Sequence, residues 1–340
     1  MVANYNKEYY IMFKCPKCGS KTTSFKCEKC SYEILIRNGV KYFCDEENIN
    51  NEDDGHKYIG YDDINIHFSP SLIYWGLDHY GIYGSSAEDI VKRYGKGIVV
   101  LDLGCGLGQA TIPFAKAGAI AIGADISEKM LEFAYQRSNG KYDNLHLCKM
   151  NAYNLNLEDE SVDVVVENAM IHLVDNPEQV YKEIYRVLKK DGKFIRFTSP
   201  GLPITDEQKQ LSINSRNAFK DVRNYYYEAL KELGYEPVDF DNNSFEIEKK
   251  YFYIPQCEEN HVVLDYEEEF TEFMKFRIHR LEHKAHSFLQ HIPDDIHQKA
   301  WEKTNEYAKG KYGEKYKEMQ SYSHYNAGYD IYKKILNYNK

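Results

Sequence analysis

Four cysteines near the N-terminus have the residue type and spacing of metal ligands. The stretch CPKCGSKTTSFKCEKC contains Cys15-x2-Cys18 and, after eight residues, Cys27-x2-Cys30. Two residues between cysteines let a tight turn aim both thiolates at one ion, and a second such turn completes a tetrahedron. Because the protein supplies all four ligands, no position stays open for a reacting water, and a structural Zn²⁺ is predicted. Residues 1–45 are therefore expected to form a small four-cysteine zinc ribbon whose folding depends on the metal.

The stretch VLDLGCGLGQ, residues 100–109, has the composition of a ligand-binding turn. The apolar run that leads into it is typical of a strand buried on both faces of a parallel sheet. Closely spaced glycines bring the backbone next to a ligand without interference from a Cβ atom. No lysine follows as in a phosphate-binding P-loop, and Gln109 stands where a dinucleotide fingerprint requires glycine.

Two acids flank this turn and favour a ligand with a cationic end. Asp102 lies two residues before the first glycine, where its carboxylate would repel a pyrophosphate. Asp125 ends the next expected strand, at a place where an acid accepts hydrogen bonds from ribose hydroxyls in such folds. The pattern therefore favours a nucleoside that also carries an amino group and a sulfonium.

These motifs, taken in order over roughly residues 97–199, resemble those of the class I S-adenosylmethionine-dependent methyltransferases. LDLGCGLG is similar to the first motif of that family, and Asp125 matches its ribose-binding acid. The segments SEKMLEFA, MNAYNLNLEDESVDVVVENAMIHLV and IYRVLKKDGKFI are similar to the segments that follow in the family. The resemblance implies an α/β fold with a doubly wound, mostly parallel, seven-stranded Rossmann-like sheet. It also implies S-adenosyl-L-methionine (SAM) as the cofactor.

The same resemblance assigns expected cofactor contacts to ten residues. The glycine turn would meet the methionine and ribose through its backbone, adenine would lie between Ile126 and Ala152, and Asn168 would lie beside the methionine tail. Where the family usually has Asp near the adenine amino group, this chain has Asn151, whose side-chain carbonyl still accepts a hydrogen bond. The full expected set is Asp102, Gly104, Cys105, Gly106, Gly108, Asp125, Ile126, Asn151, Ala152 and Asn168.

Methyl transfer from a sulfonium is an in-line displacement, in which the protein mainly holds the nucleophile and the methyl group in line. A general base is needed only where the acceptor must lose a proton. His172, just past the fourth expected strand, is the candidate base or acceptor contact, and a structural hydrogen-bonded histidine is the alternative. Aromatic residues ahead of the core are expected either to line an acceptor pocket or to pack a lid helix: Tyr74, Trp75, His79, Tyr80 and Tyr83.

Hydrophobic patterns predict the remaining elements. Strands are expected near 98–103, 119–124, 144–149, 162–167 and 193–199, with a sixth within 244–254 and a seventh near the C-terminus. Apolar residues at helical spacing between 266 and 312 predict two helices separated by Pro293, inside a helical insertion of about 256–318. Residues 46–97 are expected to be a linker and a lid segment, and residues 98–340 the methyltransferase domain. His279 and His283, four apart on one of these helices, are a second and weaker metal candidate.

Composition limits the classes of function. The 340 residues are 43% hydrophobic and 28% charged, as in a soluble globular protein. No signal peptide and no membrane span is evident, so the chain is expected to be cytoplasmic, where paired cysteines bind metal rather than form disulfides. The net charge of −10 disfavours a surface that binds nucleic acid throughout, although residues 7–41 carry eight Lys or Arg against three Glu.

Three functions stay open at this stage. The acidic body and the helical insertion favour a methyltransferase with a small-molecule acceptor. The second is a ribosomal RNA guanine-N methyltransferase, because such enzymes resemble this arrangement and a basic zinc head would bind phosphates. The third is a non-catalytic SAM-binding scaffold that uses the zinc head to bind another protein. The oligomeric state is left open.

Overall fold

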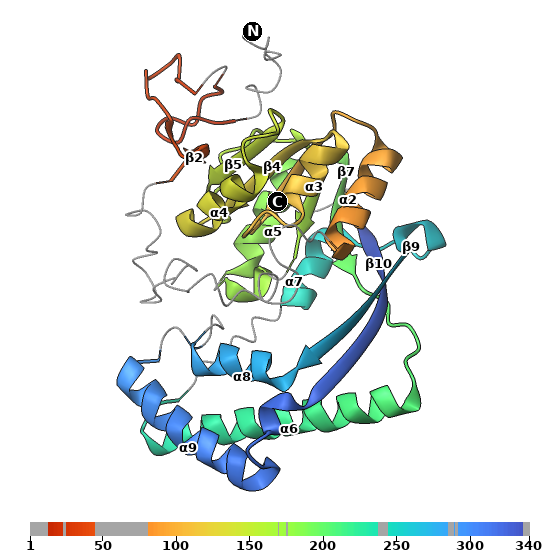
Figure 1. The fold of residues 1–340 in the computed structure, drawn as a ribbon. Coiled ribbons are helices and arrows are strands. Elements are labelled where there is room, and N and C mark those ends of the chain that lie inside the picture. The colour runs from red at the N-terminus through yellow and green to blue at the C-terminus, as the bar shows by residue number, and fades with distance from the viewer. Residues whose placement is uncertain are drawn as a thin grey trace.

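The fold comes from a computed structural model of the chain, which describes residues 13–22, 25–44, 81–168, 170–174, 176–236, 244–284, 289 and 292–335. One ten-stranded sheet organises the molecule, with the order β1-β2-β5-β4-β3-β6-β7-β10-β8 and with β9 paired to β10 (Figure 1). The strands are β1 Leu35–Arg37, β2 Val40–Tyr42, β3 Val99–Leu103, β4 Ile120–Asp125, β5 Leu145–Lys149, β6 Val162–Glu167, β7 Leu188–Thr198, β8 Phe252–Tyr253, β9 His261–Phe273 and β10 Gln320–Lys334. Pairing is parallel from β2 to β7 and antiparallel at both ends of the sheet.

Helices cover both faces of this sheet and enclose two hydrophobic clusters. One cluster packs α2 and α3 on the sheet, and the other packs α5 and α7 on the opposite face. The helices are α2 Gly81–Tyr94, α3 Thr111–Ala117, α4 Glu128–Ser138, η5 Ile171–Leu173, α5 Pro177–Val187, α6 Asp206–Glu232, α7 Ser244–Tyr251, η6 Glu258–Asn260, α8 Met274–Glu282, α9 Asp294–Tyr312 and η8 Tyr316–Glu318. This is the doubly wound, mostly parallel Rossmann-like fold that the sequence predicted, although the sheet has ten strands rather than seven.

The sixth expected strand is confirmed over only two residues, and the start of the expected helical insertion is wrong. Residues 244–251 form helix α7, and only Phe252–Tyr253 pair as a strand, because Ile247, Glu248 and Tyr251 recur at helical spacing toward the core. Residues 266–273 belong to strand β9 and not to a helix: exposed and half-buried side chains alternate along most of its length. The two expected helices do follow as α8 and α9, and Pro293 is the N-cap residue of α9.

Residues 13–44, called the head below, contribute to the same sheet. The β1–β2 hairpin turns at Asn38–Gly39, and β2 pairs in parallel with β5. Phe13, Ile34 and Phe43 are buried in the hydrophobic cluster that also contains β3, β4 and α5. The domain boundary near residue 45 stays a prediction, but the described part of the head packs as an edge of the sheet.

At the other end of the sheet a ribbon of β9 and β10 carries the lobe, which we define as α6, α8, α9 and η8. Gly328 pairs with Thr198 at the carboxyl end of β7, so the part of β10 before Gly328 runs beyond that edge of the sheet (Figure 1). The lobe encloses its own hydrophobic cluster, which includes Tyr226, Ile278 and Trp301. Among the described residues, no helix combines the length and apolar character that a membrane span requires.

Candidate cofactor site and metal centre

The parallel strands β3, β4 and β6 end at one edge of the sheet and bring the expected cofactor residues together there. The amides of Gly104 and Cys105 both donate to the carbonyl of Ala124, at 2.8 and 3.1 Å, which joins the glycine turn to β4. Met150 donates to the carbonyl of Asp125, which brings the segment after β5 alongside. The residues expected at the ligand surface keep partial exposure, whereas the strands behind them are buried: Gly104, Gly106, Asp125, Ile126, Asn151, Ala152 and Asn168 are half-buried.

The glycine turn and Asp125 form one hydrogen-bonded unit. The Gly106 amide donates to one carboxylate oxygen of Asp125 and the Ser127 amide donates to the other, both at 2.8 Å. Gly106 has φ +49°, and a Cβ there would meet no atom within 4 Å, so the turn presents bare backbone to open space at this point. Two backbone amides therefore hold the Asp125 carboxylate in place beside the glycine turn.

Gly108 and Cys105 serve the packing behind the turn. The Gly108 amide donates to the Cys105 carbonyl at 2.9 Å and closes the turn. The Cys105 side chain is buried, and burial raises the pKa of its thiol well above the ordinary value. Any ligand contact of these two residues would therefore run through the backbone.

Asp102 lies behind the glycine turn rather than on its surface. It is 4% exposed, and it accepts a 2.5 Å hydrogen bond from the Thr111 hydroxyl. Burial raises the pKa of Asp102 to about 7, and the nearby carboxylate of Asp125 acts in the same direction. A cationic ligand in front of the turn would favour the ionised form of this carboxyl group.

The segment after β5 is a short hydrogen-bonded turn. Asn151 accepts a 2.9 Å hydrogen bond from the Tyr153 amide through its side-chain oxygen. This bond leaves one lone pair of that oxygen and the side-chain amide for a ligand. Ile126 and Ala152 are half-buried at the ends of neighbouring strands, as an adenine site between them would require.

His172 lies on η5, the short helix after β6, and is exposed. Glu167 fixes the start of this helix by accepting hydrogen bonds from the amides of Met170 and Ile171, at 2.8 and 2.9 Å. Partial desolvation lowers the pKa of His172, while the charge of Glu167 acts in the opposite direction. The imidazole is therefore largely neutral at pH 7, which is the form that accepts a proton.

A buried ionic network behind His172 was missed by sequence reasoning. Arg196 pairs with Glu167 at 3.0 Å and with Glu248 at 2.8 Å, and it donates to the Tyr181 hydroxyl at 2.9 Å. The sequence carried one signal, because the adjacent segments VDVVVE and KFIRFT have an acid and a base near their carboxyl ends. Glu248 could not be placed, because a strand and not a helix was expected within residues 244–254.

Of the expected aromatic cluster, Tyr74, Trp75, His79 and Tyr80 lie outside the described residues, and Tyr83 is described. The Tyr83 ring packs edge-on against Phe197, with centroids 5.5 Å apart. The Phe197 amide in turn donates to the side-chain oxygen of Asn168 at 3.2 Å. Tyr83 therefore lies beside the expected methionine end of the site.

The four head cysteines have the geometry of a tetrahedral site. The Sγ atoms of Cys15 and Cys30 are 3.6 Å apart, those of Cys18 and Cys27 are 3.5 Å apart, and all four atoms lie within 4.8 Å of one another. Zn–S bonds of about 2.3 Å place tetrahedral sulfurs about 3.8 Å apart, so the arrangement fits Zn²⁺. Hydrogen bonds with Ser20 lower the pKa of Cys18 to about 6, which favours the thiolate that binds metal.

The second metal candidate is a group of three side chains on α8, with possible ligand atoms of His279, Glu282 and His283 within 4.8 Å. The Lys317 ammonium lies 3.5 Å from the Glu282 carboxylate, and this positive charge disfavours a bound cation. His297 is not part of this group. Its ring nitrogens contact the Tyr226 hydroxyl at 2.6 Å and the Glu282 carbonyl at 2.8 Å, as those of a structural histidine would.

The central part of the chain is similar to known methyltransferases. A family model described as a methyltransferase domain matches residues 101–196. A demethylmenaquinone methyltransferase of Lactobacillus johnsonii is 37% identical over 115 residues, which cover 32% of this chain and 47% of that protein. An uncharacterized protein of Methanocaldococcus jannaschii is 30% identical over 181 residues, which cover 52% of this chain and 82% of that protein. A Pyrococcus horikoshii protein of known structure is 29% identical with a TM-score of 0.33, and the match covers 41% of this chain and 66% of that one.

The chain thus spans about half the length of the demethylmenaquinone methyltransferase that it matches. The matched residues 101–196 run from β3 into β7 and include the glycine turn, Asp125 and Asn168. Family match, strand order and glycine turn agree with one another. The chain belongs to the class I S-adenosylmethionine-dependent methyltransferases.

Proposed function

We propose that the protein transfers the methyl group of SAM to a small-molecule acceptor. The ten expected cofactor residues would hold SAM at the carboxyl edge of β3, β4, β5 and β6. Asp125 is the proposed anchor, because two backbone amides fix its carboxylate beside the glycine turn, where it would accept hydrogen bonds from ribose hydroxyls. The buried Asp102 supplies negative charge behind the turn, toward the cationic end of the cofactor.

The acceptor site proposed here lies beside Asn168 and is aromatic. Tyr83 and Phe197 pack edge to face there, and both are half-buried. Tyr325, on β10, is influenced by Tyr83. Burial raises the pKa of Tyr325 to about 12, and Glu268 and Tyr83 add to the shift, so the Tyr325 phenol stays neutral at pH 7. Such a surface suits an acceptor with an apolar, ring-containing body. Demethylmenaquinone, named in a relative, is a small molecule and supports this class.

A small acceptor is favoured over RNA chiefly because several basic side chains of the head form ion pairs with carboxylates of the body. Lys14 pairs with Asp159 at 2.8 Å and Lys21 with Glu158 at 3.7 Å, so both face carboxylates of the body. Arg37 pairs with a further body carboxylate, and Lys41 is buried. Of the basic residues that favoured RNA in the sequence, these four therefore offer little free charge to phosphates.

The ribbon beyond the carboxyl edge adds to this choice. Its strand β9 carries the run DYEEEF, in which Asp265, Glu267 and Glu269 are exposed. This row of exposed carboxylates would repel a nucleic-acid backbone that approached the ribbon.

The reaction proposed is an in-line displacement. The acceptor's nucleophilic atom forms a bond to the methyl carbon while the carbon–sulfur bond breaks, and the electron pair stays on sulfur as S-adenosylhomocysteine leaves. Where the acceptor carries a proton, His172 is the proposed base, because its exposed imidazole is neutral and lies on the turn after β6. The head's four cysteines are proposed to bind a structural Zn²⁺ that takes no part in this step.

The test uses the zinc-loaded full chain. Calorimetry is expected to show binding of S-adenosylhomocysteine, and labelled SAM is expected to transfer its methyl group to a component of a small-molecule extract but not to ribosomal RNA. Binding without any transfer would support the scaffold, and transfer to RNA alone would establish the RNA enzyme. Either result would overturn the small-molecule proposal.

A further inference from the structure

The head contacts the end of β5 and the segment that follows it through strand β2. Strand β2 pairs with β5 up to Tyr42 opposite Lys149, and the Phe43 amide then donates to the Lys149 carbonyl at 2.9 Å. Asn151, a proposed adenine contact, follows two residues later. The head therefore fixes the end of the strand from which the adenine segment starts.

The head touches the same segment again further along. The Lys14 amide donates to the Asn156 carbonyl at 2.9 Å, and Phe13 bridges to Leu157 in antiparallel fashion. Phe13 is 1% exposed and stacks on Phe43, with ring centroids 5.1 Å apart. One aromatic pair of the head therefore links both contacts, and it lies two residues from the metal ligand Cys15.

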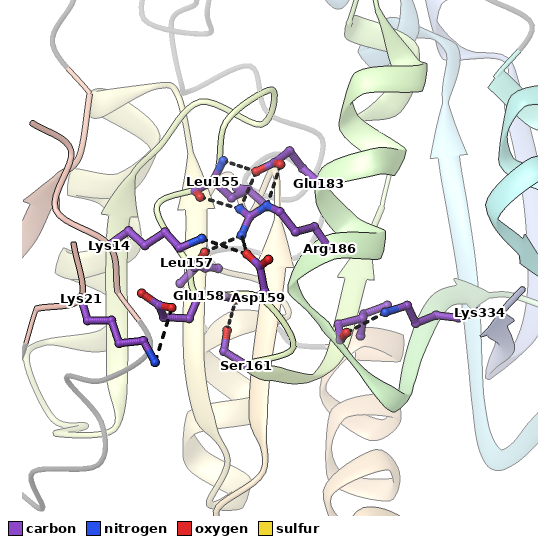
Figure 2. Close-up of polar contacts among 11 residues, drawn as sticks. Lys14, Lys21, Leu155, Leu157, Glu158, Asp159, Ser161, Glu183, Arg186 and Lys334 are labelled. Carbon is purple, nitrogen blue, oxygen red and sulfur yellow. Dashed lines mark hydrogen bonds and ion pairs between the residues drawn. The ribbon is translucent and has the colours of Figure 1, made fainter. Parts of the chain in front are cut away.

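Helix α5 holds the opposite side of residues 155–159. Figure 2 shows Lys14 and Lys21 from the head and Arg186 from α5 converging on this stretch. Arg186 donates to the carbonyls of Leu155 and Leu157 at 2.8 and 2.7 Å, and it shares Asp159 with Lys14. The stretch is thus clamped between a helix of the body and the head.

The head also holds the start of α4, the helix that follows Asp125 and Ile126. Arg37 pairs with Glu128, and the Asn38 side chain donates to Glu132 at 2.9 Å. Gly39 has φ +74°, and a Cβ there would overlap the ring of Tyr135, so this turn lies directly on α4. Both chain segments proposed to enclose the adenosine therefore border the head.

We propose that metal occupancy of the four-cysteine centre sets the affinity of the protein for its adenosyl cofactor. The metal would keep the head in the shape that holds residues 149–159 and the start of α4, so the head residues act as positioning residues without touching the ligand. This inference rests on the proposed function, because it assumes that the adenosyl group binds at Asp125 and Asn151. By linkage, the cofactor must strengthen metal binding by the same factor.

The first experiment measures S-adenosylhomocysteine binding by calorimetry on the zinc-loaded full chain and on the same sample after chelation under reducing conditions. Removal of zinc is expected to weaken binding by about tenfold or more. Competition against a chromophoric chelator should show Zn²⁺ binding strengthened by the same factor when S-adenosylhomocysteine is saturating. Equal affinities with and without zinc would overturn the inference. If the zinc-loaded chain failed to bind the nucleoside, the proposed function itself would fall.

The second experiment avoids metal removal and so covers the case in which the stripped chain unfolds. Lys14→Ala combined with Arg37→Ala removes two head charges that contact the body. Lys17→Ala combined with Lys29→Ala removes two exposed head charges for which the described residues show no ion pair, and serves as the charge-matched control. With zinc bound, the first pair is expected to weaken S-adenosylhomocysteine binding at least about threefold more than the control. Equal effects of the two pairs would contradict the proposal.

Discussion

The head lies at one end of the sheet and the lobe is carried by the β9–β10 ribbon at the other end, and the two regions are stabilised in different ways. The lobe buries its own large side chains, Tyr226 and Trp301 among them, in a cluster separate from the sheet. The head buries Phe13 and Phe43 in the core of the body and concentrates four cysteines in a metal-binding arrangement. A segment with so few apolar residues needs a bound metal or a packed neighbour for stability. The head has four cysteines that can bind a metal, and it also packs against the body. The difference indicates that changes in the head reach the cofactor side, whereas changes in the lobe stay local.

The largest expected effect comes from truncating one buried aromatic side chain in the head and one in the lobe. Phe13→Ala in the head and Trp301→Ala in the lobe each remove a buried aromatic ring and are each expected to cost about 3–5 kcal/mol in their own region. Only Phe13→Ala should also weaken S-adenosylhomocysteine binding. Thermal unfolding and calorimetry on the same samples test this, and an equal loss of affinity in Trp301→Ala would break the comparison.

The next effect is on cofactor binding by Asp125, the proposed ribose contact. Asp125→Ala should weaken S-adenosylhomocysteine binding by about 1–3 kcal/mol, because polar partners are left unpaired in a half-buried site. Asp163→Ala is the matched control, since Asp163 accepts a hydrogen bond from the Val99 amide at the opposite edge of the sheet. Similar losses in both variants would show that the ribose does not bind at Asp125.

Binding should also depend on pH through Asp102. Its pKa of about 7 means that the ionised fraction rises from about a tenth at pH 6 to about nine tenths at pH 8. SAM, as a cation, should therefore bind up to about ninefold more tightly at pH 8, and Asp102→Asn should remove the dependence. The stability contribution has the opposite sign, because a raised carboxyl pKa makes the fold lose stability as pH rises from about 4 to 7. Calorimetry at several pH values checks the first trend, and affinity independent of pH would contradict it.

The smallest effect is at the surface between the head and α5. Asp159→Asn removes the pairs with Lys14 and Arg186, and because Asp159 is 63% exposed the loss should be only about 0.2–1 kcal/mol. Lys14 and Arg186 lower the pKa of Asp159, so this stability is present above about pH 4 and is lost as pH falls further. Denaturant unfolding at pH 7 and pH 3 measures it, and the opposite trend with pH would count against the contact.

The parallel core of the sheet was predictable because its central strands β3, β4 and β6 are short apolar runs that lead into a glycine or an acid. Strands β3 to β6 begin and end within one residue of the predicted ranges, and β7 begins five residues early, at Leu188. The glycine turn and Asp125 were placed correctly at one edge, since parallel neighbours end together.

The attachment of the head was not predictable, because β2 has only three residues and its partner β5 lies about a hundred residues away. Strand β9 was missed because Phe270 and Phe273 have helical spacing, whereas the exposed acids that precede them, Asp265, Glu267 and Glu269, alternate with period two. Non-local pairing and mixed periodicity are the cases in which local patterns fail.

Hydrogen–deuterium exchange of the zinc-loaded chain, with and without S-adenosylhomocysteine, tests the central claim most directly. Protection is expected at residues 104–108, 125–128 and 150–157, and none is expected in α9 of the lobe. Binding accompanied by protection in α9 alone, with the glycine turn unchanged, would contradict it.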